Sequence, residues 1–111
     1  MLTIVTSYTR PNTSVPFFVK PQEFTTMFNN NYVLTGKLIE SKTEMTNNGL
    51  TAVVTAKWRT RADFSEFLAE PLRAPMRANR TAHMNAHGII LDQTITFTPS
   101  EGDTSPAPSS N

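Results

Sequence analysis

Three arginines at helical spacing are the clearest chemical feature of this 111-residue sequence. Arg73, Arg77 and Arg80 recur at intervals of four and three, so they would share one face of a helix. The planar guanidinium group suits carboxylate and phosphate partners, so this arginine stripe could bind an acidic protein surface or nucleic acid. A solvated helix face is the simpler interpretation. Of the two functional readings we favour a protein partner, because the predicted sheet lacks the basic and aromatic motif of RNA-binding sheets.

Aromatic residues offer a second kind of site. Trp58, Tyr32 and Tyr8 could together line a pocket for an aromatic ligand. Packing is the competing interpretation for Trp58, because it shares the apolar face of a predicted strand with Leu50 and Val54. We therefore keep all three as candidate pocket residues, while expecting Trp58 to pack against a helix or a partner subunit.

Histidines suggest a metal only weakly. His83 and His87 lie four residues apart, so their rings could project from one helix face, and Asp92 could supply a third ligand. Two ligands do not make a site and this spacing has no specificity, so we expect no metal and no cofactor. The sequence also lacks a catalytic serine motif, a phosphate-binding loop and a paired-carboxylate signature. We therefore assign no catalytic residue and expect the protein not to be an enzyme.

Length and composition limit the class of protein. A chain of 111 residues has room for one domain, and no apolar stretch is long enough to cross a bilayer. The N-terminus lacks the cationic region and apolar core of a signal peptide, and the absence of cysteine excludes disulfides. A net charge of +1 argues against a protein that mainly coats nucleic acid. We expect a cytoplasmic or virion-associated protein.

The elements that must position these side chains follow from hydrophobic periodicity. Residues 2–9 are rich in β-branched types and predict a strand, and Pro21 predicts the start of a short helix that ends at the following asparagine run. Residues 32–45 predict a long strand. The segment 47–49, Asn-Asn-Gly, predicts a two-residue hairpin turn before another strand, because Asn and Gly tolerate positive φ angles.

The second half of the chain repeats this order. Thr60 predicts a helix N-cap, and Pro71 and Pro75 predict a break or kink before a second helical stretch that ends near Gly88. Residues 89–97 predict the last strand. From residue 99 the chain is too polar and proline-rich to order itself, so we expect a domain over 1–98 and a flexible tail over 99–111.

The predicted order β-α-β-β-α-β indicates an α+β, ferredoxin-like fold: an antiparallel sheet with both helices on one face. The other face of such a sheet needs cover. A second copy of the chain can supply it by packing sheet against sheet. We therefore expect a homodimer or a larger homo-oligomer.

Residues 54–71, which run from the end of a strand through Trp58 into a capped helix, resemble the dimeric α+β-barrel family that includes antibiotic-biosynthesis monooxygenases. The resemblance implies a dimer and a pocket for an aromatic substrate gated by Trp58. Haem-degrading members of that family carry an Asn in the first strand and a haem-ligating His in the second helix. Here Thr6, Ser7 and Leu68 occupy these regions, so the resemblance supports fold and dimer rather than catalysis.

Two functions follow from these features. Our main expectation is a non-catalytic structural or interaction protein that assembles through its sheet, a component of a virus or phage particle, with the arginine stripe or the tail as its attachment to a protein partner. The alternative is a small monooxygenase-like or ligand-binding protein of the dimeric barrel type, with a pocket near Trp58. A nucleic-acid-binding accessory domain is less favoured.

Overall fold

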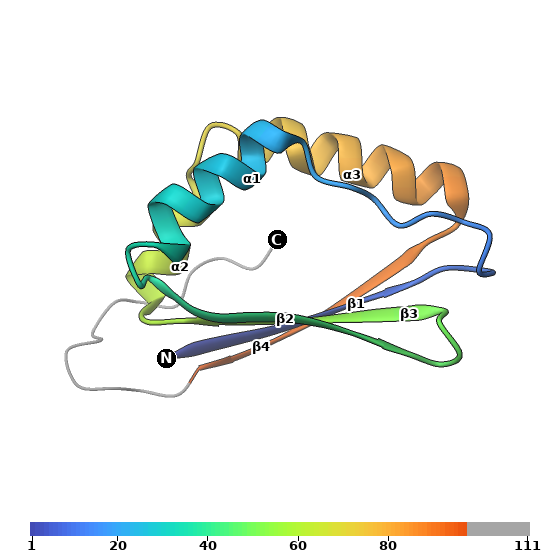
Figure 1. Cartoon of the computed structure of the whole chain (residues 1–111), viewed down its shortest axis with the longest axis horizontal. Coiled ribbons are helices and arrows are strands. Elements are labelled where there is room, and N and C mark those ends of the chain that lie inside the picture. The colour runs from blue at the N-terminus through green and yellow to red at the C-terminus, as the bar shows by residue number, and fades with distance from the viewer. Residues whose placement is uncertain (98–111) are drawn as a thin grey trace.

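The chain folds into one antiparallel sheet with all its helices on one side, in a computed structural model that describes residues 1–97 (Figure 1). The strands lie in the order β2-β3-β1-β4. In chain order the elements are β1 (Leu2–Thr9), α1 (Gln22–Phe28), the π-helical turn η1 (Asn29–Val33), β2 (Leu38–Thr46), β3 (Thr51–Trp58), α2 (Arg61–Leu68), α3 (Arg73–His87) and β4 (Ile90–Phe97). The predicted ferredoxin-like α+β fold is confirmed.

Strand register gives the sheet two different faces. In β1 the alternate residues Leu2, Ile4 and Thr6 are buried against the helices. The antiparallel pairing places Leu2 opposite Trp58, so the most buried residues of the two central strands meet. The opposite side, which we call the outer face, carries residues such as Val53, and none of the helices of residues 1–97 lies over it (Figure 1).

Aromatic rings form the core where α1 and α2 meet the sheet. Trp58 is 2% exposed and Tyr32 is fully buried. The Trp58 ring centroid lies 5.2 Å from that of Phe67 and 5.5 Å from that of Tyr32. Because buried aromatic side chains contribute large apolar areas, this cluster fixes α1, α2 and β3 relative to one another.

The prediction of a long strand over residues 32–45 is wrong for the residues before Leu38. The asparagine run does not end the helix but widens it into η1, where the Leu34 amide donates to the Asn29 carbonyl across 2.9 Å. The widened turn directs Tyr32 into the core, and β2 starts only at Leu38. Tertiary packing of one aromatic ring therefore overrides the local strand pattern.

The hairpin between β2 and β3 is present, but its turn is longer than the predicted two residues. Thr46 pairs with Thr51, which leaves four residues in the loop. Asn47, Asn48 and Gly49 all have positive φ angles, of 54°, 55° and 82°. Asparagine and glycine tolerate this conformation, so the residue types were read correctly while the loop length was not.

The predicted break in the second helical region is confirmed at one of the two prolines. Pro71 lies in the connection between α2 and α3. Pro75 lies in the first turn of α3 and does not interrupt it, because amides there have no partner within the helix. The predicted ends also agree: the Thr60 hydroxyl accepts from the Asp63 amide across 3.1 Å, and Gly88 closes α3 with a φ of 70°.

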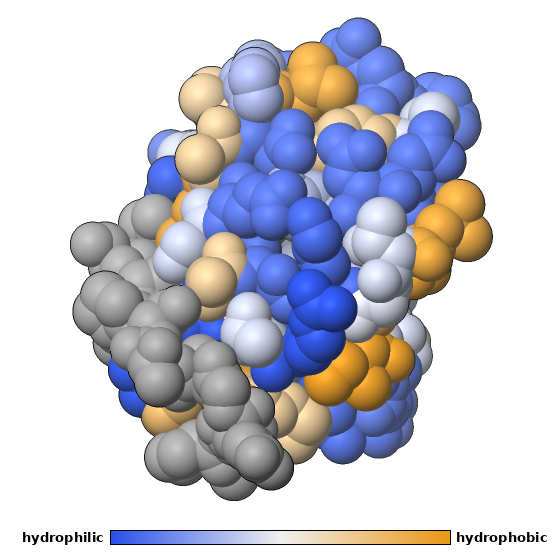
Figure 2. Space-filling model, turned by 90° about the vertical axis from the view of Figure 1, so that its left-hand side faces the viewer, coloured by the Kyte–Doolittle hydropathy of each residue, from blue (hydrophilic) through white to orange (hydrophobic). Residues whose placement is uncertain are grey.

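The exterior of the described part is mixed in polarity. Seen from the end that Figure 2 presents, hydrophilic side chains predominate and the hydrophobic ones form separate patches. No helix within residues 1–97 has the length and apolar character needed to cross a membrane. The predicted tail, and the last residue assigned to the domain, lie outside the described residues.

Candidate functional site

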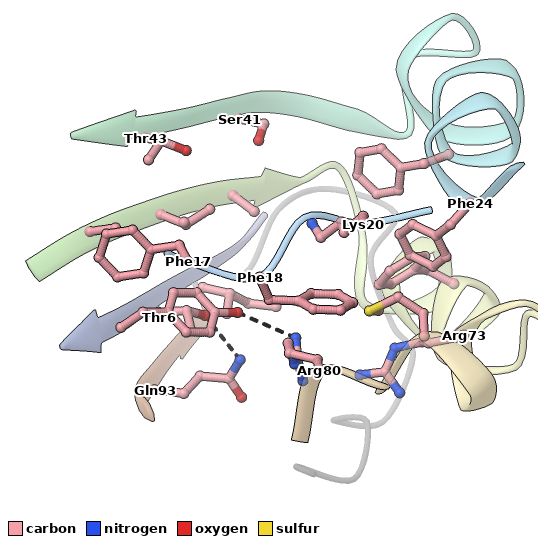
Figure 3. Close-up of a pocket in the computed structure, with 18 of the residues that line it drawn as sticks. Thr6, Phe17, Phe18, Lys20, Phe24, Ser41, Thr43, Arg73, Arg80 and Gln93 are labelled. Atoms are coloured by element: carbon pink, nitrogen blue, oxygen red, sulfur yellow. Dashed lines mark hydrogen bonds between the residues drawn. The ribbon is translucent and has the colours of Figure 1, made fainter. Parts of the chain in front are cut away.

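A cavity of about 390 Å³ lies between the helices and the helix-facing side of the sheet, and we call it the helix–sheet cavity (Figure 3). The central strands supply its floor, including Ile4 and Val54. Ser41, Thr43 and Met45 of the edge strand β2 also line it, and all three are exposed. The cavity therefore opens to solvent along β2.

Aromatic and aliphatic side chains make most of its wall. Trp58 closes one end together with the α1 and α2 rings of Phe24 and Phe67. Phe17 and Phe18, from the segment that precedes α1, line the other side of the cavity mouth (Figure 3). Such a wall suits a flat apolar ligand, because aromatic rings stack or pack edge-to-face with one another.

The polar groups in this wall are few. Gln93 of β4 donates from Nε2 to the Thr6 hydroxyl across 3.1 Å, and Arg80 donates from Nη1 to the Tyr8 hydroxyl across 3.3 Å. Figure 3 draws both bonds at the sheet side of the cavity. These hydroxyls and the Gln93 amide are groups that could orient a ligand by hydrogen bonding.

Three cationic side chains line the cavity, and no carboxylate does. Lys20 comes from the segment before α1, while Arg73 and Arg80 come from α3, two helical turns apart (Figure 3). Within residues 1–97 none of the three forms an ion pair. Several other cations do form ion pairs, as where Arg59 contacts the Asp63 carboxylate at 2.8 Å. The cavity is thus a locally positive, largely apolar space.

Burial in this positive space shifts the ionisation of two of these groups. Desolvation, reinforced by the nearby charges of Arg77 and Arg80, lowers the pKa of Arg73 to about 10. Desolvation first, and then the charge of Arg80, lowers the pKa of Lys20 below its usual value. Both shifts have the sign expected of cations that lack a negative partner.

The segment between β1 and α1 is held in place at both sides of the cavity. Arg10 donates to the Gly49 carbonyl from Nη2 across 2.7 Å and to the Val15 carbonyl from Nη1 across 2.9 Å. Its guanidinium carbon lies 4.6 Å from the centre of the Phe17 ring. On the α3 side, His83 Nε2 donates to the Pro16 carbonyl across 2.7 Å. These contacts position Phe17 over the cavity.

The structure places only part of the predicted pocket at the cavity. Tyr8 and Trp58 line it. Tyr32 does not, because its ring is enclosed in the core and its hydroxyl donates to Glu70 Oε1 across 2.6 Å. A ligand-binding role for any of the three stays a prediction.

The arginine stripe is divided by the fold. Arg73 and Arg80 line the cavity, whereas Arg77 is not among the lining residues. The use of the stripe to bind a protein partner stays a prediction, as does the same role for the tail, which lies outside the described residues.

The two histidines have structural contacts. The rings of His83 and His87 lie 4.5 Å apart, and His83 also packs against Phe18 at 5.9 Å. Among residues 1–97 no group of three or more potential metal ligands comes together.

Five residues line the cavity that were not predicted from the sequence as site residues: Thr6, Phe17, Phe18, Lys20 and Gln93. Their sequence neighbourhoods carry no motif. One signal could have found Phe17 and Phe18, which are two adjacent aromatic residues in a proline-rich connection where little else is apolar.

No protein-family model matches the chain, and no curated protein matches its sequence. Solved structures do match its fold. A candidate antibiotic biosynthesis monooxygenase from Deinococcus radiodurans has a TM-score of 0.52 at 9% identity, over 96% of this chain and 100% of that one. Rv0793 from Mycobacterium tuberculosis has a TM-score of 0.54 at 12% identity, over 93% and 100%. SnoaB from Streptomyces nogalater, described as a cofactor-independent oxygenase, has a TM-score of 0.46 at 15% identity, over 91% and 95%.

These matches confirm, at the level of fold, the resemblance inferred from residues 54–71. They also overturn the main expectation for function. The structures named above include no component of a virus or phage particle, and the Deinococcus protein is described as a candidate monooxygenase. The alternative, a pocket protein of the dimeric barrel type, is the better interpretation.

Proposed function

We propose that this chain is a small monooxygenase-like protein that binds an aromatic substrate in the helix–sheet cavity. One observation carries the proposal: a cavity of about 390 Å³ with aromatic walls and a few convergent polar groups opens beside Trp58. Small-molecule sites in proteins typically have volumes of about 300–1,000 Å³ and this mixture of wall and polar groups. The cavity is therefore large enough to enclose a substrate of two or three fused rings.

The fold supports oxygen chemistry as the activity, since the Deinococcus protein that shares it is described as an antibiotic biosynthesis monooxygenase. A ring methylene next to a phenol or ketone is a suitable reacting group. In its oxidation by O2 two C–H bonds are replaced by one C=O bond, and the second oxygen atom leaves with both hydrogens as water. The carbon supplies all four electrons, so the substrate is itself the reductant. The chain would bind the substrate, orient it and exclude water.

A homodimer is part of the same proposal. At the centre of the outer face Val5 lies opposite Thr55 and Val53 lies opposite Ser7, and the edge strand β2 adds charged residues such as Lys42 and Glu44. Within residues 1–97 no element covers that face (Figure 1). Packing two such faces together would bury them and leave both helix–sheet cavities on the outside of the dimer.

The test combines binding and turnover on the full chain. Fluorescence of Trp58, the single tryptophan, should be quenched by fused aromatic phenols and ketones with one site per chain. With a substrate that carries a reactive ring methylene, an oxygen electrode should record one O2 consumed per ketone formed. Binding without O2 uptake by any such compound would reduce the proposal to a ligand-binding protein. Absence of binding would reject it.

A further inference from the structure

We infer that the ligand of the helix–sheet cavity carries an oxyanion, a carboxylate or an ionised phenol, which Lys20, Arg73 and Arg80 bind. This inference rests on the proposed function, because it names the chemical class of the ligand for that same cavity. Its basis is the charge of the cavity wall and the hydrogen bonds that its cations leave unmade.

The wall of the cavity carries positive charge with no negative charge to balance it. The residues lining the cavity include three cations and no aspartate or glutamate. In a wall that is otherwise mostly apolar, like charges repel each other more strongly than they would in water. A protein that needed only an apolar ligand would gain stability from uncharged side chains at these positions. A ligand with a negative charge removes the repulsion.

Two arginine side chains of the cavity wall have a buried hydrogen-bond donor without an acceptor in the described residues. Nε of Arg73 and Nε of Arg80 are buried and donate to no group within residues 1–97. Buried polar groups in proteins are nearly always hydrogen-bonded, so an unpaired donor marks a place where a partner is missing. Arg73 and Arg80 lie two turns apart on α3, and both line the same cavity. A planar oxyanion can accept from both, because guanidinium groups bind carboxylate-like oxygens in a fork geometry.

The three cations of the cavity come from two different parts of the chain and lie among its aromatic residues. Lys20 lies on the segment before α1, whereas the two arginines lie on α3. An anion bound between this segment and α3 would therefore be contacted from two sides (Figure 3). Arg73 and Lys20 both lie beside aromatic rings of the wall: the Arg73 guanidinium carbon is 5.4 Å from the centre of the Phe67 ring, and Lys20 Nζ is 5.8 Å from that of Phe24. A ligand that carries its negative group close to its fused rings would match this arrangement. The lowered pKa values of Lys20 and Arg73 agree with it, since burial and then neighbouring positive charge lower both.

The test uses two fluorescent probes that share their aromatic rings and differ by one sulfonate group. Anilinonaphthalene sulfonate is an aromatic anion, and phenylnaphthylamine is its neutral counterpart. On the full-length protein we expect one site per chain for each probe, with the anion bound at least about ten-fold more tightly. We expect Arg73→Gln and Arg80→Gln each to weaken sulfonate binding by about ten-fold or more, and to change phenylnaphthylamine binding by less than about two-fold.

Arg77→Gln is the matched control, because it removes the same charge from the same helix outside the cavity. It should leave both affinities nearly unchanged. Retained phenylnaphthylamine binding shows that a variant is folded. If the two probes bind equally well, or if Arg77→Gln weakens sulfonate binding as much as Arg73→Gln, the anion inference is overturned while the proposed aromatic site stands. If neither probe binds, the proposed function fails and the inference with it.

Competition then identifies the oxyanion. Naphthoate, naphthol and naphthylmethanol share one ring system and differ in the group they carry. Displacement of the sulfonate probe by naphthoate supports a carboxylate ligand, and displacement by naphthol, increasing as the phenol ionises, supports a phenolate. Equal displacement by uncharged naphthylmethanol would contradict both and overturn the inference.

Discussion

Arg80 and Tyr8 join α3 to β1 across the helix–sheet cavity through one hydrogen bond of 3.3 Å from the guanidinium Nη1 to the phenol oxygen. Within residues 1–97 this is the one hydrogen bond that the Arg80 side chain makes, and its Nε has no partner there. Tyr8 therefore determines where the Arg80 charge lies. The bond also connects a helix and a strand that are 72 positions apart in sequence.

Tyr8→Phe removes this acceptor and leaves the ring. We expect the free energy of unfolding to fall by about 0.5–1.5 kcal/mol, the usual net contribution of one such bond. Sulfonate-probe affinity should fall a few-fold, because Arg80 loses its orientation, while phenylnaphthylamine affinity should not change. Urea unfolding and probe titration measure the two effects. Unchanged affinity for both probes would show that Tyr8 does not orient Arg80 for binding.

Tyr32→Phe tests the buried bond from the Tyr32 hydroxyl to the Glu70 carboxylate. Burial, and then this bond, raise the pKa of Tyr32 well above its usual value of 10.0. Above about pH 10 the unfolded chain therefore loses a proton that the native state keeps, so wild-type stability falls as pH rises. We expect the variant to lack this part of the decline. Urea unfolding from neutral pH to about pH 11 measures it. Parallel curves for the two proteins would contradict the assignment.

Much of this fold is local enough to be read from sequence. The alternation in residues 2–9, the Thr60 cap and Gly88 each depend on near neighbours, and the structure has all three where they were expected. Tyr32 was misassigned for the opposite reason. Its position depends on contacts with Trp58 and Glu70, which are distant in sequence, and no local sequence pattern predicts those contacts.

The candidate site was less accessible to sequence reasoning than the fold. The arginine stripe was recognised, but its spacing gives no indication that Arg73 and Arg80 face a cavity while Arg77 does not. Lys20 joins them only because the segment before α1 folds back over the sheet. A cavity forms where the helices and the sheet do not pack completely against each other. Its presence depends on the packing of the whole domain rather than on any one segment.

Val5→Arg tests the homodimer. Val5 lies at the centre of the outer face, between Thr55 of β3 and Thr94 of β4, where a dimer would bury it, so a charged side chain there would lose its hydration with no carboxylate directly opposite it. We expect the dimer Kd to rise by about a hundred-fold or more, which light scattering or mass photometry would record as a monomer. Ala78→Arg on the exposed side of α3 is the control and should remain dimeric. A wild-type monomer at micromolar concentration would reject the dimer itself.

Arg73→Met tests whether the positive cavity is kept for binding at the expense of stability. The Arg73 Nε is buried without a partner, and the charges of Arg77 and Arg80 oppose its own. Burial and these like charges lower its pKa to about 10, so the charged guanidinium is less favourable in the native state than in the unfolded chain, and this cost applies at neutral pH, where Arg73 is charged in both states. Methionine keeps the length of the side chain and removes the charge.

We expect Arg73→Met to raise the free energy of unfolding of the ligand-free protein by about 1 kcal/mol, or the Tm by roughly 4–8 °C. It should also weaken binding of the sulfonate probe. Arg59→Met is the matched control and should lower stability, because Arg59 pairs with the buried Asp63 carboxylate. Differential scanning calorimetry without ligand separates the two. If Arg73→Met were as destabilising as Arg59→Met, Arg73 would serve the fold and not the ligand.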